Sequence, residues 1–330
     1  MTLQGIGVSV MPLDNRREFL VAAAIEADRL GYGAFVLPET WALDVPVVLA
    51  EAAVKTRRIV LGTGIVGVWG RSAGTLAMTA ATLASLSSGR FVLGLGASTA
   101  QLAEGLHDVP FQQPTVRLRR VLTQVRALLR GERIPLAAGG ARALKLNLPP
   151  APDVPIYLAG LADESVRLAG ELADGWLPFL YPRSRLTVGR ALLAEGRARR
   201  SDPAGELPAI YPSVPTVVAE DPERARAGAA WFVAFYLTTM GTLYRHSLAR
   251  QGYSKEVEAV LAANTPRNRG VVPPEAEALL DELTIFGTPA QARAALDRWR
   301  AAGAALPVVL LPPNLTRDEL DFTLNGLRPA

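Results

Sequence analysis

The chain has 330 residues, a length that fits two average domains or one large α/β barrel with insertions. Hydrophobic residues make up 49% of the sequence, which is enough for a substantial core and excludes disorder over most of the chain. There is no cysteine, which excludes disulfides and thiolate metal sites, and the net charge of +4 is only mildly basic.

Two arginine clusters lie at 117–120 and 195–200. Each is typical of a solvated helix face, and neither is interleaved with aromatic residues, so we expect no nucleic-acid partner. The first residues lack a basic stretch followed by an apolar signal core, and no uninterrupted apolar run reaches about 18 residues. We therefore expect a cytoplasmic protein with no membrane partner.

Short apolar or β-branched runs alternate with helical patterns along the chain. The helical patterns cover 16–30, 44–56, 73–86, 115–130, 163–173 and 183–199. The runs typical of strands cover 5–10, 34–37, 58–65, 91–95, 155–159, 175–179, 210–218 and 306–311. Gly31 is a helix-stop residue, and Asp44 with Pro46 is typical of a helix start. Because this alternation implies a parallel sheet with right-handed crossovers, eight strands favour a closed (β/α)8 TIM barrel over an open sheet.

Two segments exceed the minimal barrel. Residues 131–154 are rich in proline and glycine, so we predict a surface excursion there. Residues 220–285 carry several helical patterns, and we predict a helical insertion that covers the mouth of one barrel domain spanning 1–330. Four aromatic residues of this insertion are candidates for a wall or lid over an apolar substrate, or for ordinary helix packing: Trp231, Phe232, Phe235 and Tyr236.

The carboxyl ends of parallel strands are where α/β proteins hold ligands. The second predicted strand is followed by Glu39 and Trp41, a carboxylate and an indole suited to a ring system. The alternative is a glutamate at a helix entry and a tryptophan packed on the rim. The third strand ends in Gly62, Thr63, Gly64 and Ile65, where glycine permits unusual geometry or close approach of a planar ligand.

The fourth predicted strand runs into Gly94-Leu95-Gly96-Ala97-Ser98-Thr99. This run superficially resembles a dinucleotide fingerprint, but it lacks the third glycine and does not follow the first strand. Two interpretations stay open. The glycines relieve crowding inside the barrel, or the strand end lines a ligand.

The chain has two histidines, His107 and His246. Without cysteine no spaced Cys/His cluster is possible, so we expect no metal. There is also no Gly-x-Ser-x-Gly elbow and no Walker loop. Glu104 and His107 share a face if that segment is helical, which makes His107 a candidate general acid or a half-buried structural histidine.

The fifth predicted strand leads through Ala159-Gly160-Leu161-Ala162 into a helix that begins near Asp163-Glu164-Ser165. Free N–H groups at a helix N-terminus suit a phosphate. The charges of Asp163 and Glu164 oppose an anion, so simple capping of the helix is the alternative.

Four segments together carry a resemblance to a known family: 62–98 with its SGRF and LGLG runs, 103–120, 155–178 with its ADG, and 285–304. In this combination the chain strongly resembles the bacterial luciferase-like monooxygenase superfamily, nearly end to end. It is most similar to the branch that uses the deazaflavin coenzyme F420, as in methylene-tetrahydromethanopterin reductase.

The resemblance implies a (β/α)8 barrel with a flavin or deazaflavin ring at its carboxyl-terminal mouth. It implies a non-prolyl cis peptide near Gly64-Ile65, behind the ring. It also implies that Ala97–Thr99 and Gly160–Ser165 hold the ribityl and phosphate groups, and that the protein is a homodimer or higher homo-oligomer.

The chain departs from the family at three places. Some deazaflavin-dependent dehydrogenases carry a catalytic histidine where this chain has Thr40, and many relatives have an acidic residue where it has Arg120. Relatives often have Gly-Pro where it has Thr99-Ala100.

We expect an F420-dependent oxidoreductase that moves a hydride between the deazaflavin and a small organic substrate, with Glu39, Trp41 and His107 as candidate catalytic residues. The expected cofactor-binding residues are Thr63, Gly64, Ile65, Gly96, Ala97, Ser98, Thr99, Ala159, Gly160, Leu161, Ala162 and Ser165. One alternative is an FMN-dependent monooxygenase supplied by a separate reductase. Another, prompted by Thr40 and Arg120, is a non-catalytic binding protein that keeps the barrel.

Overall fold

The computed structural model describes residues 3–136, 142–200 and 205–329. All pairings between its strands are parallel, in the order β10-β9-β11-β1-β2-β3-β5-β6-β7-β8, with β4 attached to β5. The strands are β1 (Gly7–Val10), β2 (Ala34–Leu37), β3 (Val60–Thr63), β4 (Val66–Gly67), β5 (Phe91–Gly96), β6 (Ile156–Leu158), β7 (Gly175–Trp176), β8 (Ala209–Ile210), β9 (Ser213–Val218), β10 (Ile285–Gly287) and β11 (Val308–Leu311).

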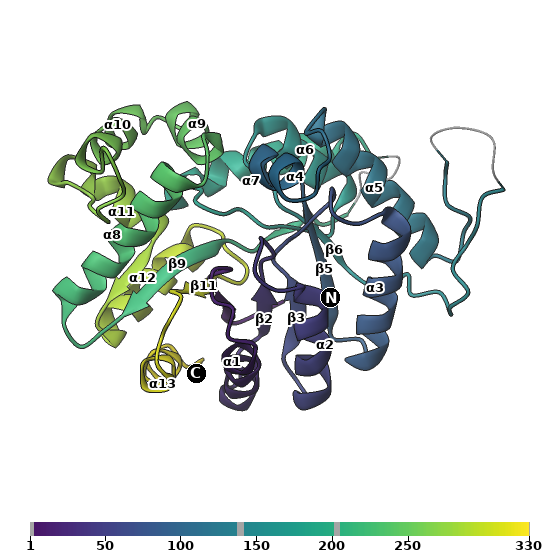
Figure 1. Ribbon diagram of the computed structural model, residues 1–330, viewed down its shortest axis with the longest axis horizontal. Helices are drawn as coiled ribbons and strands as arrows, with labels where there is room; N and C mark the ends of the chain where they lie inside the picture. Colours follow the sequence, from purple (N-terminus) through teal and green to yellow (C-terminus); the bar gives the residue numbers. More distant parts are fainter. Residues whose placement is uncertain (1–2, 137–141, 201–204, 330) are drawn as a thin grey trace.

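Helices follow most strands and lie around the sheet (Figure 1). The α-helices are α1 (Arg17–Leu30), α2 (Val45–Lys55), α3 (Ala73–Leu86), α4 (Ala100–Gly105), α5 (Pro114–Leu129), α6 (Asp163–Leu172), α7 (Leu186–Arg197), α8 (Pro222–Thr239), α9 (Leu243–Arg250), α10 (Ser254–Ala263), α11 (Glu277–Leu283), α12 (Pro289–Ala301) and α13 (Arg317–Gly326). Short 3-10 turns, η1 (Arg183–Arg185) and η2 (Pro274–Ala276), precede α7 and α11.

The sheet curls until its two ends approach each other. The amide of Tyr211 donates to the carbonyl of Trp176 over 2.8 Å, and on the other side the amide of Val308 donates to the carbonyl of Pro212 over 2.8 Å. The run from β8 to β9 therefore bonds to β7 and to the segment entering β11, and the parallel, curled α/β sheet of the prediction is present.

Most predicted helices lie where the sequence places them. The left-handed Gly31 ends α1, and the side chain of Asp44 accepts from the amide of Val47 at the start of α2, with Pro46 in its first turn. Two short strands are additions to the predicted set, since β4 lies after the third predicted strand and β10 lies at the end of the predicted insertion. The predicted strand 175–179 is shorter, because only Gly175–Trp176 is strand.

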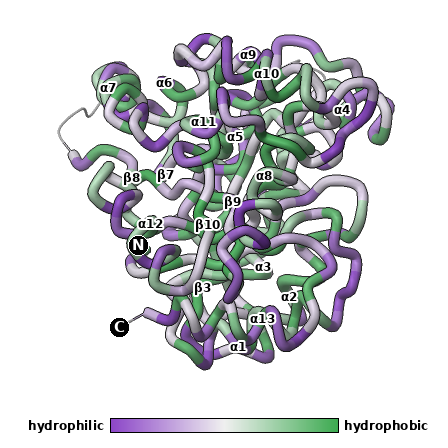
Figure 2. Tube along the Cα trace, turned by 90° about the vertical axis from the view of Figure 1, so that its left-hand side faces the viewer, coloured by the Kyte–Doolittle hydropathy of each residue, from purple (hydrophilic) through white to green (hydrophobic). Residues whose placement is uncertain are grey.

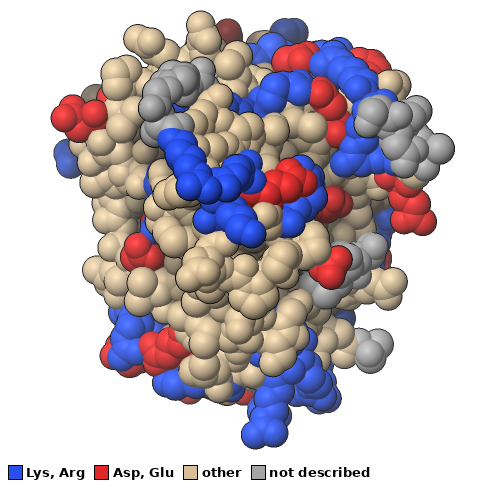
Figure 3. Space-filling model, turned by 90° about the vertical axis from the view of Figure 1, so that its right-hand side faces the viewer, with Lys and Arg blue, Asp and Glu red and all other residues tan. Residues whose placement is uncertain are grey.

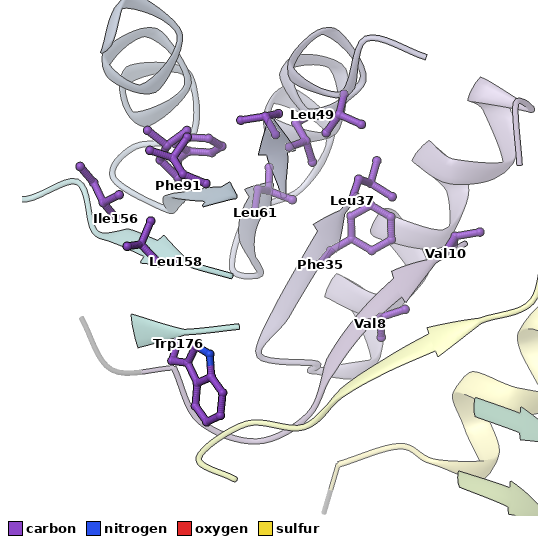
Figure 4. Close-up of a cluster of buried hydrophobic side chains, with 14 of the residues drawn as sticks. Val8, Val10, Phe35, Leu37, Leu49, Leu61, Phe91, Ile156, Leu158 and Trp176 are labelled. Atoms are coloured by element: carbon purple, nitrogen blue, oxygen red, sulfur yellow. The ribbon is translucent and has the colours of Figure 1, made fainter. Parts of the chain in front are cut away.

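Alternation along the strands divides the buried side chains between two sides of the sheet. One set faces the helices and includes Val8, Phe35, Leu61, Phe91 and Trp176. Figure 4 draws these side chains together with Leu49 of α2. The other set fills the inside of the curl and includes Ala34, Val92 and the stacked rings of Tyr157 and Tyr211, 4.8 Å apart.

A third hydrophobic cluster lies within α8–α11 and reaches Met11, Leu180 and Leu310 at the ends of sheet strands. Figure 1 shows these helices gathered on one side of the sheet, in green, opposite α3 and α5. Figure 2 faces that side and shows hydrophobic stretches in the interior under more hydrophilic outer turns. No helix in the described part of the chain is long and apolar enough to cross a bilayer.

The predicted excursion at 131–154 has no helix or strand among its described residues, and 137–141 lie outside them. Its two flanks are joined by a bond from the amide of Ile134 to the carbonyl of Leu144, 2.8 Å. The flanks extend away from α5 at the right of Figure 1.

The arginine clusters do more than face solvent. Arg119 pairs with Glu171, Arg199 with Glu164 at 2.7 Å, and Arg117 lies 4.5 Å from the centre of the Trp69 ring. Figure 3 shows the side that carries α3 and α5, where basic side chains lie beside acidic ones. Several of these arginines therefore tie neighbouring elements together.

Candidate active site

The inner face of the sheet has an apolar floor at its carboxyl end, formed by Val36, Ile65, Ala159 and Leu177. A Cβ built on Gly96 would lie 2.9 Å from Ile65, one on Gly94 would lie 3.0 Å from Leu177, and one on Gly64 would lie 3.3 Å from Val36. All four floor residues are half-buried, although they point to the inside of the curl. The floor is therefore open to solvent at the end of the sheet where parallel α/β proteins bind ligands.

The peptide bond between Gly64 and Ile65 is cis, as the family resemblance implied. The chain also forms a bulge here. Gly62 pairs with Val92 and Val66 pairs with Leu95, so the segment from β3 to β4 advances four residues while β5 advances three. A bulge of one surplus residue re-aims the side chains around it. Here it brings Ile65 over Gly96 and into the floor.

Thr63, a predicted cofactor contact, also joins two strands. Its buried hydroxyl donates to the carbonyl of Gly94 and accepts from the amide of Gly94, both over 2.8 Å. A Cβ on Gly94 would come within 1.9 Å of the Thr63 carbonyl oxygen. Thr63 thus joins β3 to β5, and Gly94 is required for their close approach, which supports the interpretation that this glycine relieves crowding.

The loop after β5 is held by a tryptophan that the sequence analysis did not single out. The Trp69 indole N–H donates to the carbonyl of Ala97 over 2.5 Å, and its ring packs 5.1 Å from that of Phe111. The next residue, Ser98, has a φ of 57°, and Thr99 precedes α4 without a side-chain cap. Ala97, Ser98 and Thr99 are half-buried at the same end of the sheet as the floor.

The loop from β6 to α6 presents a helix N-terminus at this end. Ala162 precedes α6 without a side-chain cap, and the amide of Val166 is the first to bond along the helix, to the Ala162 carbonyl. The Ser165 hydroxyl donates to that same carbonyl over 2.6 Å. Helix geometry leaves the N–H groups of the first turn without helical partners, available to an anion.

Two further contacts define this loop. The indole N–H of Trp176 donates to the carbonyl of Gly160 over 2.9 Å, while Leu161 packs against the outer hydrophobic core. Glu164, whose charge opposes an anion, is paired with Arg199 at 2.7 Å. Its pKa is lowered by that arginine.

Glu39 lies in an ion-pair cluster at the end of β2. Both its carboxylate oxygens accept from Arg71, at 2.9 and 2.6 Å, and Arg71 also reaches Asp44 at 2.7 Å. Burial raises the pKa of Glu39 above its ordinary value, and Arg71 opposes that rise. The amide of Glu39 donates to the Ile65 carbonyl over 3.0 Å, which fixes the cluster beside the floor.

The structure brings His107 to this cluster, whereas Trp41 shares no hydrogen bond or ring contact with its members. A Cβ on Gly70 would lie 2.5 Å from the His107 ring, so the imidazole packs on the residue before Arg71, and it interacts electrostatically with Glu39. Trp41 is 48% exposed, and its indole has no hydrogen bond or ring contact with the described residues. Arg71 was missed, although its place in the Trp-Gly-Arg run after β4 could have suggested a partner for Glu39.

An aromatic group stands at the opposite side of the mouth. Phe179 contacts Tyr236 at 4.7 Å and Tyr244 at 5.6 Å between ring centres, and the two tyrosine rings are 5.3 Å apart. The other three predicted lid residues behave differently. Phe232 of α8 is fully buried, while the rings of Trp231 and Phe235 stack on each other with their centres 5.2 Å apart. Helix packing thus accounts for part of the predicted wall, and Tyr236 is the residue that reaches the mouth.

Among the residues that the structure describes, no three His, Asp or Glu side chains gather in a way that suits a metal ion.

Comparisons with known proteins agree on one family. The sequence profile of the luciferase-like monooxygenase family matches residues 2–306. A protein of Mycobacterium tuberculosis, provisionally named a coenzyme F420-dependent oxidoreductase, is 32% identical over 325 residues, which cover 90% of this chain and 91% of that protein. The 5,10-methylenetetrahydromethanopterin reductase of Methanolobus tindarius is 26% identical over 77% of this chain and 78% of its own length.

Solved structures share the fold. The coenzyme F420-dependent tetrahydromethanopterin reductase of Methanopyrus kandleri superposes with a TM-score of 0.77 at 19% identity, over 100% of this chain and 99% of that one. The FMN complex of the 3,6-diketocamphane monooxygenase component from Pseudomonas putida gives 0.67 at 16% identity, over 100% of this chain and 96% of that one. At these identities the likeness establishes the architecture alone.

Proposed function

The chain belongs to the luciferase-like monooxygenase family and is an enzyme of it, and from that premise we propose that it uses coenzyme F420 to move a hydride to or from a small organic substrate. The relative with an F420-dependent name, similar over 90% of this chain, is the observation that carries the cofactor assignment. The family's fold alone does not choose between F420 and FMN.

The proposed architecture is a closed (β/α)8 barrel in a single domain. The run from β8 to β9 serves as one strand, supported by its backbone bonds to Trp176 on one side and to Val308 on the other. The segment 131–154 is then an excursion, and 220–285, with α8–α11, is an insertion before the last strand.

The residues at the mouth fit a flat, partly apolar cofactor with a phosphate. The floor of Val36, Ile65, Ala159 and Leu177 would face the ring, and the first turn of α6 would face the phosphate. Ser98 and Thr99 would lie along the chain that connects them. The deazaflavin supplies the hydride chemistry when bound, and the protein supplies placement and a dry surface.

Glu39 and His107 are the groups placed to handle a proton. Glu39 is held in position by Arg71 and by its own backbone bond to Ile65, next to the floor. His107 lies on the adjacent Gly70 and completes the set of titratable groups at this corner. Trp41, which is half exposed, is assigned no contact with the reacting atoms.

The proposed assembly is a homodimer through α2 and α3. Two valines of α2 are exposed, Val47 by 67% and Val54 by 66%, and Met78 of the neighbouring α3 is exposed by 48%. Val47 and Val54 lie seven residues apart and share one face of α2, and a contiguous exposed apolar patch is typical of an interface.

Titration of the purified protein with F420 and, separately, with FMN tests the cofactor. We expect saturable quenching of F420 fluorescence and none of FMN fluorescence. Saturable binding of FMN with no binding of F420 would replace the proposal with the FMN-dependent alternative.

A substitution at the floor tests where F420 binds. Ala159→Phe places a large ring on the floor and should abolish F420 binding while leaving the far-ultraviolet circular dichroism unchanged. Ala262→Phe, on the exposed face of α10, is the matched control and should bind F420 as the wild type does.

A further inference from the structure

Phe179 is the inward-facing residue at the rim of the sheet. Gly175, Leu177 and Phe179 occupy alternate positions along one extended run, and Leu177 packs on Gly94 inside the curl. Phe179 still pairs with Ser213 as part of the sheet. It therefore stands directly beyond the floor, where it meets the two tyrosines of the helical segment.

The hydroxyls of Tyr236 and Tyr244 have no hydrogen-bond partner among the residues that the structure describes. Tyr236 is only 4% exposed and Tyr244 is half-buried, but neither hydroxyl oxygen is among the fully buried polar atoms without a partner, so each still reaches open space. A phenol that is packed among other rings while its hydroxyl stays open is placed to donate to a bound molecule. Two such hydroxyls on neighbouring rings therefore suit a polar atom of a ligand.

The charged side chain nearest to the pair along the chain is Arg245, whose guanidinium donates to the carbonyls of Leu237 and Thr238. Burial raises the pKa of Tyr244, and burial together with the neighbouring Tyr244 raises the pKa of Tyr236, with no contribution from a charged side chain. Both phenols therefore remain protonated at neutral pH and act as hydrogen-bond donors. The ring faces of Phe179 and of the tyrosines supply apolar surface around those donors.

We propose that Phe179, Tyr236 and Tyr244 form the substrate half of the site, which takes a neutral organic molecule with an apolar body and a carbonyl or hydroxyl oxygen that accepts from the two phenols. This inference rests on the proposed function, because it assigns the substrate class of the same mouth. It also separates the two halves of the site: the floor of β3, β5, β6 and β7 for the cofactor, and the aromatic group for the substrate.

The test compares two probes of the same shape on the protein with excess F420 in solution. The probes are cyclohexanone, which carries a C=O group, and methylenecyclohexane, which carries a C=CH2 group in its place. Binding is measured by calorimetric titration. We expect cyclohexanone to bind about tenfold more tightly in the wild type, the factor that one or two neutral hydrogen bonds supply.

Tyr236→Phe and Tyr244→Phe should each weaken cyclohexanone binding about threefold to tenfold and leave methylenecyclohexane unchanged. Tyr253→Phe, whose hydroxyl lies 3.4 Å from Ser184 on the same helical segment, is the control and should change neither. Removal of a hydroxyl that bonds to no described residue should leave the melting temperature nearly unchanged, so folding is not at risk.

Equal affinities for the two probes, no binding of cyclohexanone, or unchanged affinity in both phenylalanine variants would overturn the inference. F420 fluorescence is titrated in parallel on each variant. If F420 fails to bind while the protein still discriminates between the probes, the cofactor proposal fails and the substrate inference stands. If F420 binds and the discrimination is absent, the reverse holds.

Discussion

At the scale of single residues, the raised pKa of Glu39 predicts how turnover depends on pH. Its raised pKa keeps a fraction of the carboxyl protonated at a pH where an ordinary glutamate is ionised. If the protonated form donates to the substrate, turnover falls as pH rises through that pKa. The charged or titratable groups that face it are Arg71, Asp44 and His107.

The Glu39→Gln variant should therefore lose this alkaline limb of the kcat profile, and its kcat should fall about 100-fold, with F420 affinity unchanged. Glu51→Gln removes a half-buried carboxylate of α2 that pairs with Arg17 and Lys55, and should leave the profile as in the wild type. Persistence of the same limb in Glu39→Gln would assign the titration to another group.

Gly94 makes a prediction about stability. Gly94→Ala drives a methyl group into the Thr63 carbonyl, a backbone atom that cannot turn aside, so we expect a loss of about 1–3 kcal/mol. Urea denaturation measures it. Gly105→Ala, with nothing within 4 Å of the added carbon, is the control, and an equal loss there would contradict the explanation.

At the scale of elements, α12 illustrates how local sequence positions a helix. The Thr288 side chain accepts a hydrogen bond from the backbone amide of Gln291, and the Gln291 side chain accepts one from the backbone amide of Thr288. Pro289 begins the first turn. Loss of this capping box in Thr288→Ala should cost about 1 kcal/mol of unfolding free energy. Thr123→Ala, exposed in the middle of α5, should cost less, and a reversed order would contradict the prediction.

The helices were predictable because their signals are local. Caps such as Asp44 and stops such as Gly31 act within a few residues. In the structure α2 begins directly after Asp44 and α1 ends directly before Gly31. The short strands β4 and β10 were not predictable, because two or three residues show no period and their pairing depends on β5 and β9.

The candidate site follows the same division. The glycines at the strand ends were visible in sequence, and the structure places His107 next to the Glu39 cluster. Other features depend on contacts between distant segments, which no pattern in one sequence reports. They are the hydrogen bonds of Thr63 to Gly94, the ion pair of Arg71 with Glu39, and the contact of Phe179 with Tyr244.

At the scale of the whole molecule, the proposed dimer predicts the mass of the protein in solution. Val54→Glu places a charge in the α2–α3 surface and should shift the protein from dimer to monomer in light scattering after size exclusion. Val188→Glu changes the same residue type at an exposed position on α7, 46% accessible, and should leave the dimer intact. A wild-type protein that elutes as a monomer would remove the proposal.

The placement of α8–α11 bears on how such an enzyme changes its preference over time. These helices are one continuous stretch of chain between β9 and β10, whereas the floor and the α6 turn come from earlier strands. Exchange of residues 222–283 for the equivalent stretch of a relative would then alter which molecules are accepted and keep the coenzyme. Selection can thus rework one stretch of the gene for a new compound while the inherited redox machinery stays in place.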